Sequence, residues 1–81
     1  MSVGRFKSAF INASSATRSQ IIWQVSQANA DNPQIGNMLS NLDVNYKVMK
    51  DPKDEAIQRR RADNIYFVCQ QLEAFPNFKY H

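Results

Sequence analysis

Few side chains in this chain of 81 residues have the chemistry that catalysis or metal binding requires. Three carboxylates stand close together at Asp51, Asp54 and Glu55, a grouping that suits a metal ion or acid–base chemistry. The same residues stand where a helix is expected to begin, and carboxylates at a helix N-terminus cap its free N–H groups and favour its dipole. We therefore interpret this group as a helix cap and expect no metal site.

Histidine and cysteine, the usual residues for proton transfer and nucleophilic attack, are each present once. His81 is the last residue of the sequence, so no histidine-based triad or paired-histidine metal site is available. Cys69 stands in an apolar run, with no histidine or basic residue beside it along the helix to lower the pKa of its thiol, which is typical of a small core residue. We predict a protein that is not an enzyme and requires no cofactor.

The basic residues of the chain favour a nucleic-acid hypothesis, because the net charge is +3 and the isoelectric point is about 9.3. Residues 1–30 contain no acidic side chain, so the excess positive charge lies in that part of the sequence. In this hypothesis the groups that contact phosphate are Arg5, Lys7, Arg18 and Arg60. Ordinary solvated charge explains most of the other basic residues, so we keep nucleic acid as the alternative partner.

Three consecutive arginines, Arg59–Arg61, stand shortly before the apolar run Ile65–Cys69. On a helix, successive side chains are rotated by about 100°, so the three guanidinium groups point in different directions. Arg59 is expected to face water and to pair with acidic residues one turn away, while Arg60 lies on the flank of the helix. Arg61 falls within the apolar stripe, so it must extend past the edge of the core or pair with a carboxylate from another helix or subunit.

Proline marks the boundaries of the elements that position these side chains. Asn32-Pro33 and Asp51-Pro52 each combine a good N-cap with the residue favoured in the first helical turn. The strongest helix signal follows Pro33, where an apolar stripe runs at regular three- and four-residue spacing as far as Met49. We expect one domain over residues 1–81, divided into a basic N-terminal arm at 1–14, helices at 15–30, 33–50 and 52–75, and a tail at 76–81.

The expected fold class is all-α: a small three-helix bundle, or a long helical hairpin braced by a first helix, with aromatic N- and C-terminal arms. Phe6 and Phe10 are spaced four residues apart, which suggests a short helix or a docked arm at the N-terminus. At the other end, Phe78 and Tyr80 are expected to pack back onto the bundle.

Each long helix also carries an apolar side chain on the side expected to face water. Isolated apolar residues are common on protein surfaces, and the terminal arms are another way to cover these side chains. The sharper hypothesis is a second interface, because aromatic and arginine side chains dominate binding hot spots. Its members are Trp23, Val44, Val48, Arg60, Arg61, Tyr66 and Phe67.

The sequence therefore favours a non-enzymatic protein–protein interaction module, an adaptor, assembly factor or inhibitor that acts by surface contact. We expect it to be oligomeric and to bind another protein, a second copy of itself, or both, with no membrane and no small-molecule substrate as partner. One cysteine and the absence of long apolar runs predict a cytoplasmic protein, or one in the host-cell cytoplasm if it is viral. Its small size is typical of accessory or phage proteins.

Overall fold

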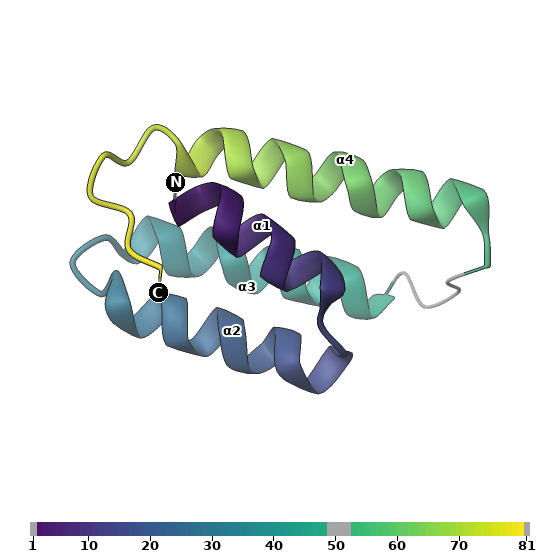
Figure 1. Ribbon diagram of the computed structural model, residues 1–81, viewed down its shortest axis with the longest axis horizontal. Helices are drawn as coiled ribbons and strands as arrows, with labels where there is room; N and C mark the ends of the chain where they lie inside the picture. Colours follow the sequence, from purple (N-terminus) through teal and green to yellow (C-terminus); the bar gives the residue numbers. More distant parts are fainter. Residues whose placement is uncertain (1, 49–52, 81) are drawn as a thin grey trace.

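The computed structural model describes residues 2–48 and 53–80 and is all-helical over them. Consecutive helices run in opposite directions, so the chain goes up, down, up and down through one bundle (Figure 1). The helices are α1 (Ser2–Asn12), α2 (Ser15–Ala28), α3 (Pro33–Val48) and α4 (Glu55–Leu72). The all-α prediction is confirmed, but the expected count of three helices is wrong, because the N-terminal segment is itself a helix.

The N-terminal segment is helical because its aromatic side chains complete the core. Phe6 and Phe10 have no exposed surface, and their rings lie 5.7 Å apart on one side of α1. Burying two phenylalanines contributes on the order of 2 kcal/mol each, which offsets the cost of ordering a short helix. The segment expected as a basic arm is therefore part of the bundle.

Local capping sets where the next helices begin. Ser14 caps α2, and its hydroxyl oxygen accepts a hydrogen bond from the Thr17 N–H at 3.3 Å. Asp54 caps α4 by accepting from the Ala56 N–H at 2.9 Å. Each cap satisfies an N–H group that the helix itself leaves free.

The observed boundaries correct those expected from the sequence. Helix α4 begins at Glu55 instead of residue 52, and it ends at Leu72 instead of 75. Helix α2 ends at Ala28, two residues before the expected end, because Asn29 takes a non-helical conformation as its C-cap. The expected end of the preceding helix at residue 50 and the expected cap Asp51 lie outside the described residues.

The four helices surround one core, with α1 opposite α3 and α2 opposite α4 (Figure 1). Helix α3 packs against both α2 and α4, and α4 also packs against α1. None of the helices in the described ranges is long and apolar enough to cross a membrane. The large side chains with almost no exposed surface are Phe6, Phe10, Ile35, Leu39, Leu42, Ile65 and Leu72.

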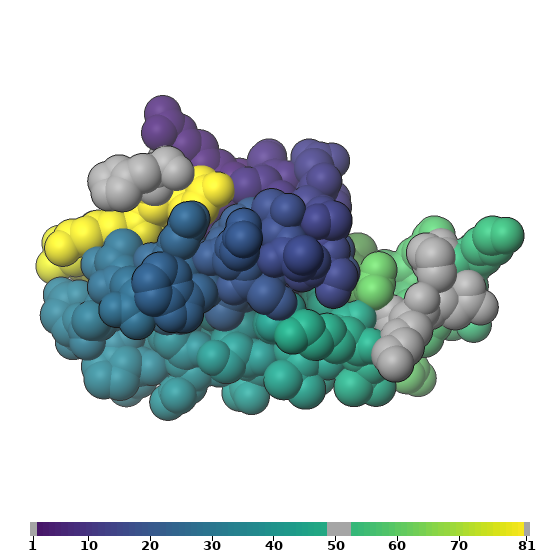
Figure 2. Space-filling model, turned by 90° about the horizontal axis from the view of Figure 1, so that it is seen from below, coloured from purple at the N-terminus to yellow at the C-terminus, as the bar shows by residue number. Residues whose placement is uncertain are grey.

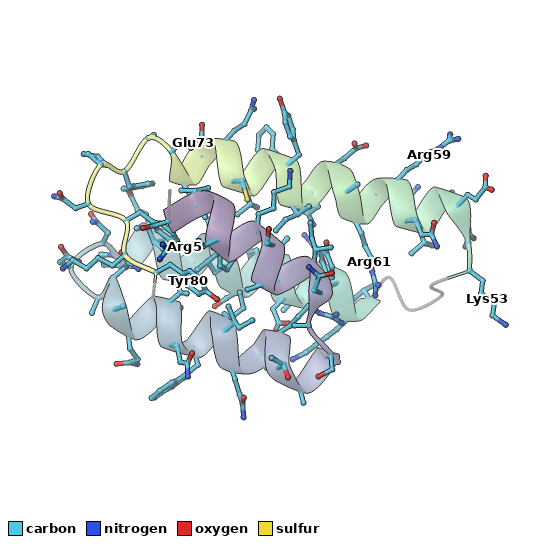
Figure 3. The ribbon with its side chains drawn as sticks, viewed as in Figure 1. Arg5, Lys53, Arg59, Arg61, Glu73 and Tyr80 are labelled. Carbon is cyan, nitrogen blue, oxygen red and sulfur yellow. The ribbon has the colours of Figure 1, made fainter. Side chains whose placement is uncertain are left out.

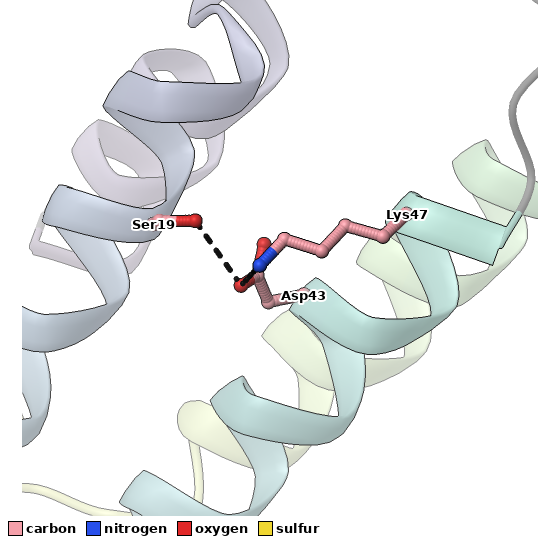
Figure 4. Close-up of polar contacts among 3 residues, drawn as sticks. All are labelled: Ser19, Asp43 and Lys47. Carbon is pink, nitrogen blue, oxygen red and sulfur yellow. Dashed lines mark hydrogen bonds and ion pairs between the residues drawn. The ribbon is translucent and has the colours of Figure 1, made fainter.

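A polar contact joins α2 to α3 at the edge of this core (Figure 4). The Ser19 hydroxyl donates to the Asp43 carboxylate at 3.4 Å, and the Lys47 ammonium lies 3.1 Å from the same oxygen. The lysine side chain is half exposed, so this pair contributes well under about 1 kcal/mol.

The tail after α4 returns across the bundle and fills the space between α1 and α2 (Figure 2). As expected, its aromatic residues pack on the core: the Phe78 and Tyr80 rings lie 6.2 and 6.0 Å from that of Phe6, both edge-on. The side chain of Asn29 holds the tail in place, because its amide donates to the Lys79 carbonyl and accepts from the Lys79 N–H, each at 2.9 Å. A third bond, to the Val25 carbonyl at 2.8 Å, fixes the orientation of that amide.

Replacing Asn29 with alanine should therefore destabilise the protein by about 1–3 kcal/mol, because three hydrogen bonds are lost at a side chain that is only 1% exposed. The measurement is urea unfolding followed by circular dichroism. Asn37→Ala is the matched control, since Asn37 is exposed on α3 and its replacement should change stability by less than about 0.5 kcal/mol. Equal stability of the two variants would contradict a role for Asn29 in holding the tail.

Candidate functional site

The antiparallel order brings the end of α1, the start of α2, the end of α3 and the first half of α4 to the same end of the bundle (Figure 1). Helix α1 has 11 residues and α4 has 18, so α1 leaves the first turns of α4 uncovered. A hollow of about 760 Å³ lies at this end of the bundle. We call it the Tyr46 pocket, and its lining includes Lys7, Ile11, Arg18, Tyr46, Arg61 and Tyr66.

Arg61 and Tyr46 hold one another by three contacts. The Arg61 Nη2 donates to the backbone carbonyl of Tyr46 at 2.9 Å, and the Tyr46 hydroxyl donates to the backbone carbonyl of Arg61 at 3.3 Å. The guanidinium carbon also lies 4.9 Å from the centre of the tyrosine ring, within the range of a cation–π contact. The expectation that Arg61 lies in the apolar stripe is confirmed, but among the described residues its side chain pairs with a carbonyl and a ring, not with a carboxylate.

Arg18 reaches the same ring from α2. Its guanidinium carbon lies 5.3 Å from the centre of the Tyr46 ring and 5.9 Å from that of Phe10. Its Nη1 donates to the Ala13 carbonyl at 2.9 Å, which fixes the side chain across the turn between α1 and α2. The Nε–H groups of Arg18 and Arg61 are both buried, and neither has a hydrogen-bond acceptor among residues 2–48 and 53–80.

The side chains that line the Tyr46 pocket carry a net positive charge. Arg18, Arg61 and one further cation line it together with a single carboxylate, that of Asp63. Lys7 contributes the third cation, with its Nζ 5.9 Å from the centre of the Tyr66 ring. Within the described parts of the chain, Lys47 pairs with Asp43, and no carboxylate there forms an ion pair with Lys7, Arg18 or Arg61. The pairing expected between Arg59 and acidic residues on its own helix is likewise not formed.

Burial of the Tyr46 hydroxyl disfavours its ionised form. It raises the pKa of this group above the usual value of 10.0, and the positive charges of Arg61 and Arg18 offset part of the rise. Tyr46 is therefore a neutral hydrogen-bond donor at physiological pH, and its proton is available for the bond to the Arg61 carbonyl.

The apolar residues assigned to an interface are all exposed, as the helical spacing predicts, but they do not form one surface. Trp23 is 65% exposed on α2, whereas Tyr66 is 56% and Phe67 60% exposed on α4, at the opposite edge of the bundle. Val44 and Val48 are exposed on α3. Only Tyr66 of these five lines the Tyr46 pocket.

Ile11 was not among the interface residues expected from the sequence, although it is half exposed and lines the pocket with Tyr66. It stands next to the buried Phe10, so the position of the aromatic pair along α1 would have placed Ile11 on the outer side.

The four basic residues of the nucleic-acid hypothesis, like the exposed apolar residues, do not lie on one surface. Lys7 and Arg18 line the Tyr46 pocket, and Arg60 is exposed on α4 next to Arg61. Arg5 lies toward the other end of the bundle (Figure 3). The four residues expected to bind phosphate therefore do not form a continuous basic surface.

The remaining candidates for chemistry within residues 2–48 and 53–80 are Cys69, Asp54 and Glu55. Cys69 is buried, and burial raises the pKa of its thiol above the usual value of 9.0. No group of three histidine, cysteine or acidic side chains that could hold a metal exists in the described residues, Asp54 and Glu55 included. Asp51 and His81 lie outside them.

Comparison of this chain with protein-family models, with curated proteins and with solved structures found no match. The Tyr46 pocket and the exposed apolar side chains are therefore the features from which a function can be inferred.

The raised pKa of Tyr46 predicts a loss of stability in alkaline solution. The folded chain holds this proton more tightly than the unfolded chain, so its contribution is fully present below pH 10.0 and is lost as the pH rises through the higher, folded-state pKa. Urea unfolding of Tyr46→Phe and Tyr66→Phe between pH 8 and pH 11 measures this contribution. The Tyr66 variant should lose stability more steeply with pH than the Tyr46 variant, and equal slopes would contradict the prediction.

Burial of Cys69 predicts slow reaction with thiol reagents. Dithionitrobenzoate at pH 8 should modify the native protein at least about tenfold more slowly than the same protein in denaturing urea, because reaction requires both exposure and the thiolate. The colour released at 412 nm reports the rate. Equal rates in the two solutions would show that the thiol is accessible in the folded state.

Proposed function

We propose that this protein is a non-enzymatic protein–protein interaction module that acts by surface contact, as an adaptor, assembly factor or inhibitor. Its partner is another protein or a second copy of the same chain. The observation that supports this most strongly is the composition of the Tyr46 pocket, where exposed apolar side chains meet cations that have no carboxylate partner among the described residues.

The pocket combines the residue types that carry most binding energy at protein interfaces. Tyrosine and arginine are enriched among hot spots, and they lie in pockets that exclude water when the partner binds. Tyr66 and Ile11 provide about half-exposed apolar surface, while Arg18 and Arg61 provide fixed hydrogen-bond donors beside it. The Tyr66 hydroxyl accepts a hydrogen bond from Gln70 at 2.9 Å, which orients its ring on the surface.

The other exposed apolar residues extend the surface that a partner can contact. Phe67 adjoins Tyr66 on α4, and Val44 and Val48 are one turn apart on α3. Trp23 lies beside a separate hollow lined by polar residues of α2. Because these residues occupy several faces, we infer an oligomer or an assembly with more than one contact surface.

Nucleic acid stays the alternative partner, and one observation favours it. Lys7 and Arg18, two of the four cations assigned to phosphate binding, lie in the same pocket as the aromatic residue Tyr66. Aromatic rings beside cations also suit the stacking of unpaired bases. The two partners differ in salt dependence, because phosphate binding weakens steeply as salt is added.

Replacing Tyr66 or Trp23 with alanine should weaken assembly more than folding. Loss of a hot-spot side chain costs about 2 kcal/mol or more in binding, about a 30-fold rise in Kd, whereas an exposed substitution changes folding stability by roughly 0.5 kcal/mol or less. Light scattering after size exclusion, over a concentration series, measures self-association. If the partner is another protein, that protein is first isolated by crosslinking, and its binding to each variant is then measured.

Gln71→Ala is the matched control, since Gln71 is exposed on α4 and does not line the Tyr46 pocket. Unchanged size and unchanged partner binding in both aromatic variants would overturn the proposed function. Tight binding to a mixed-sequence oligonucleotide that disappears with added salt would support the alternative.

A further inference from the structure

We infer that the Tyr46 pocket binds a carboxylate of an acidic segment of the partner protein, with an apolar side chain next to that carboxylate resting on Ile11 and Tyr66. This inference rests on the proposed function and names the chemistry that the partner must present. It assigns the carboxylate to the guanidinium groups of Arg18 and Arg61, with Lys7 as an additional cation.

The charges in the pocket favour an anionic ligand. Arg18 and Arg61 lie beside the same ring, so their guanidinium carbons cannot be further apart than the sum of 5.3 and 4.9 Å. Like charges within this bound repel one another, and salt screens that repulsion less here than in open solution because both side chains are partly buried. A bound carboxylate would remove this repulsion.

The hydrogen-bond donors of the two arginines point to the same ligand. A guanidinium group carries five N–H donors, and in the described structure each arginine uses a single N–H, to the carbonyl of Ala13 or of Tyr46. Those bonds and the ring contacts hold both side chains in place, so little side-chain entropy is lost when a ligand binds. Paired N–H groups of a guanidinium match the geometry of a carboxylate.

The rest of the lining favours an acidic peptide over a phosphate group. Ile11, Ala62 and Ile65 give the pocket apolar walls, which suit a hydrocarbon side chain. Asp63 lies on the same lining, and its negative charge repels a doubly charged phosphate more strongly than a carboxylate. A nucleic acid also needs a line of cations along its backbone, yet Arg5 and Arg59 lie toward opposite ends of the bundle (Figure 3).

The test is a nuclear magnetic resonance titration that follows the Nε–Hε signals of Arg18 and Arg61. The probes are a capped tetrapeptide with glutamate beside leucine, the same peptide with glutamine in place of glutamate, sodium phosphate, and a single-stranded oligonucleotide. The glutamate peptide should shift both arginine signals saturably. The glutamine peptide should bind at least about tenfold more weakly, because it lacks the charge.

Variants locate the binding in the pocket. Arg18→Gln should weaken binding of the glutamate peptide about tenfold. Lys7→Gln should weaken it about threefold, and no hydrogen bond of Lys7 within residues 2–48 and 53–80 is lost by that change. Arg59→Gln is the control, since Arg59 is exposed and outside the lining, and it should leave binding within about twofold. Circular dichroism of each variant confirms that it is folded.

Three outcomes would overturn the inference. The two peptides bind equally, phosphate or the oligonucleotide binds more tightly than the glutamate peptide, or the Arg18 and Lys7 variants behave like the Arg59 control. Failure of the inference is distinguishable from failure of the proposed function. If Tyr66→Ala still weakens assembly while the two peptides bind equally, the interaction module stands and the carboxylate site falls. If the glutamate peptide is preferred while assembly is unchanged in Tyr66→Ala and Trp23→Ala, the carboxylate site stands and the interaction module falls.

Discussion

All four helices meet at the ring of Tyr46. The residue belongs to α3, and its ring lies edge-on to that of Phe10 in α1 at 4.9 Å. Arg18 of α2 and Arg61 of α4 lie beside the same ring, and Arg61 also exchanges hydrogen bonds with the Tyr46 backbone and hydroxyl. A single aromatic side chain therefore connects the hydrophobic core to the charged end of the bundle.

This arrangement explains how two partly buried arginines can lie at the edge of a small core. A guanidinium group is weakly hydrated and planar, so it can lie on an aromatic ring at a lower cost than an ammonium group. The contacts hold both arginines near the surface but keep their Nε–H groups without an acceptor in the described residues. The same contacts that complete the fold thus leave a positive pocket open to a partner, which links the stability of the bundle to the proposed function.

Helical periodicity was enough to predict much of this from the sequence. It placed Tyr46 and Arg61 in the apolar stripes of their helices, and it identified the exposed apolar residues, of which Tyr66 lines the pocket. Periodicity within one helix does not say which helix ends meet, so the pairing of Arg61 with Tyr46 instead of a carboxylate was not predictable.

The remaining errors came from contacts between distant parts of the sequence. The N-terminal segment was expected as either a short helix or a docked arm, and the burial of Phe6 and Phe10 against the other helices explains why it is a helix. The role of Asn29 could not be recognised in the sequence, because its side chain forms hydrogen bonds with a tail residue 50 positions later. The cap was expected at Asp51, next to a proline, but Asp54 provides the cap observed for α4.

The contact of both arginines with the Tyr46 ring is tested most directly by the ring-current shifts of their Hε protons. Protons over the face of an aromatic ring resonate upfield of their usual position. Tyr46→Leu, which keeps an apolar side chain but removes the ring, should move the Hε signals of Arg18 and Arg61 downfield together, whereas Tyr66→Leu should leave both unchanged. Signals that stay in place in a folded Tyr46→Leu protein would contradict the account.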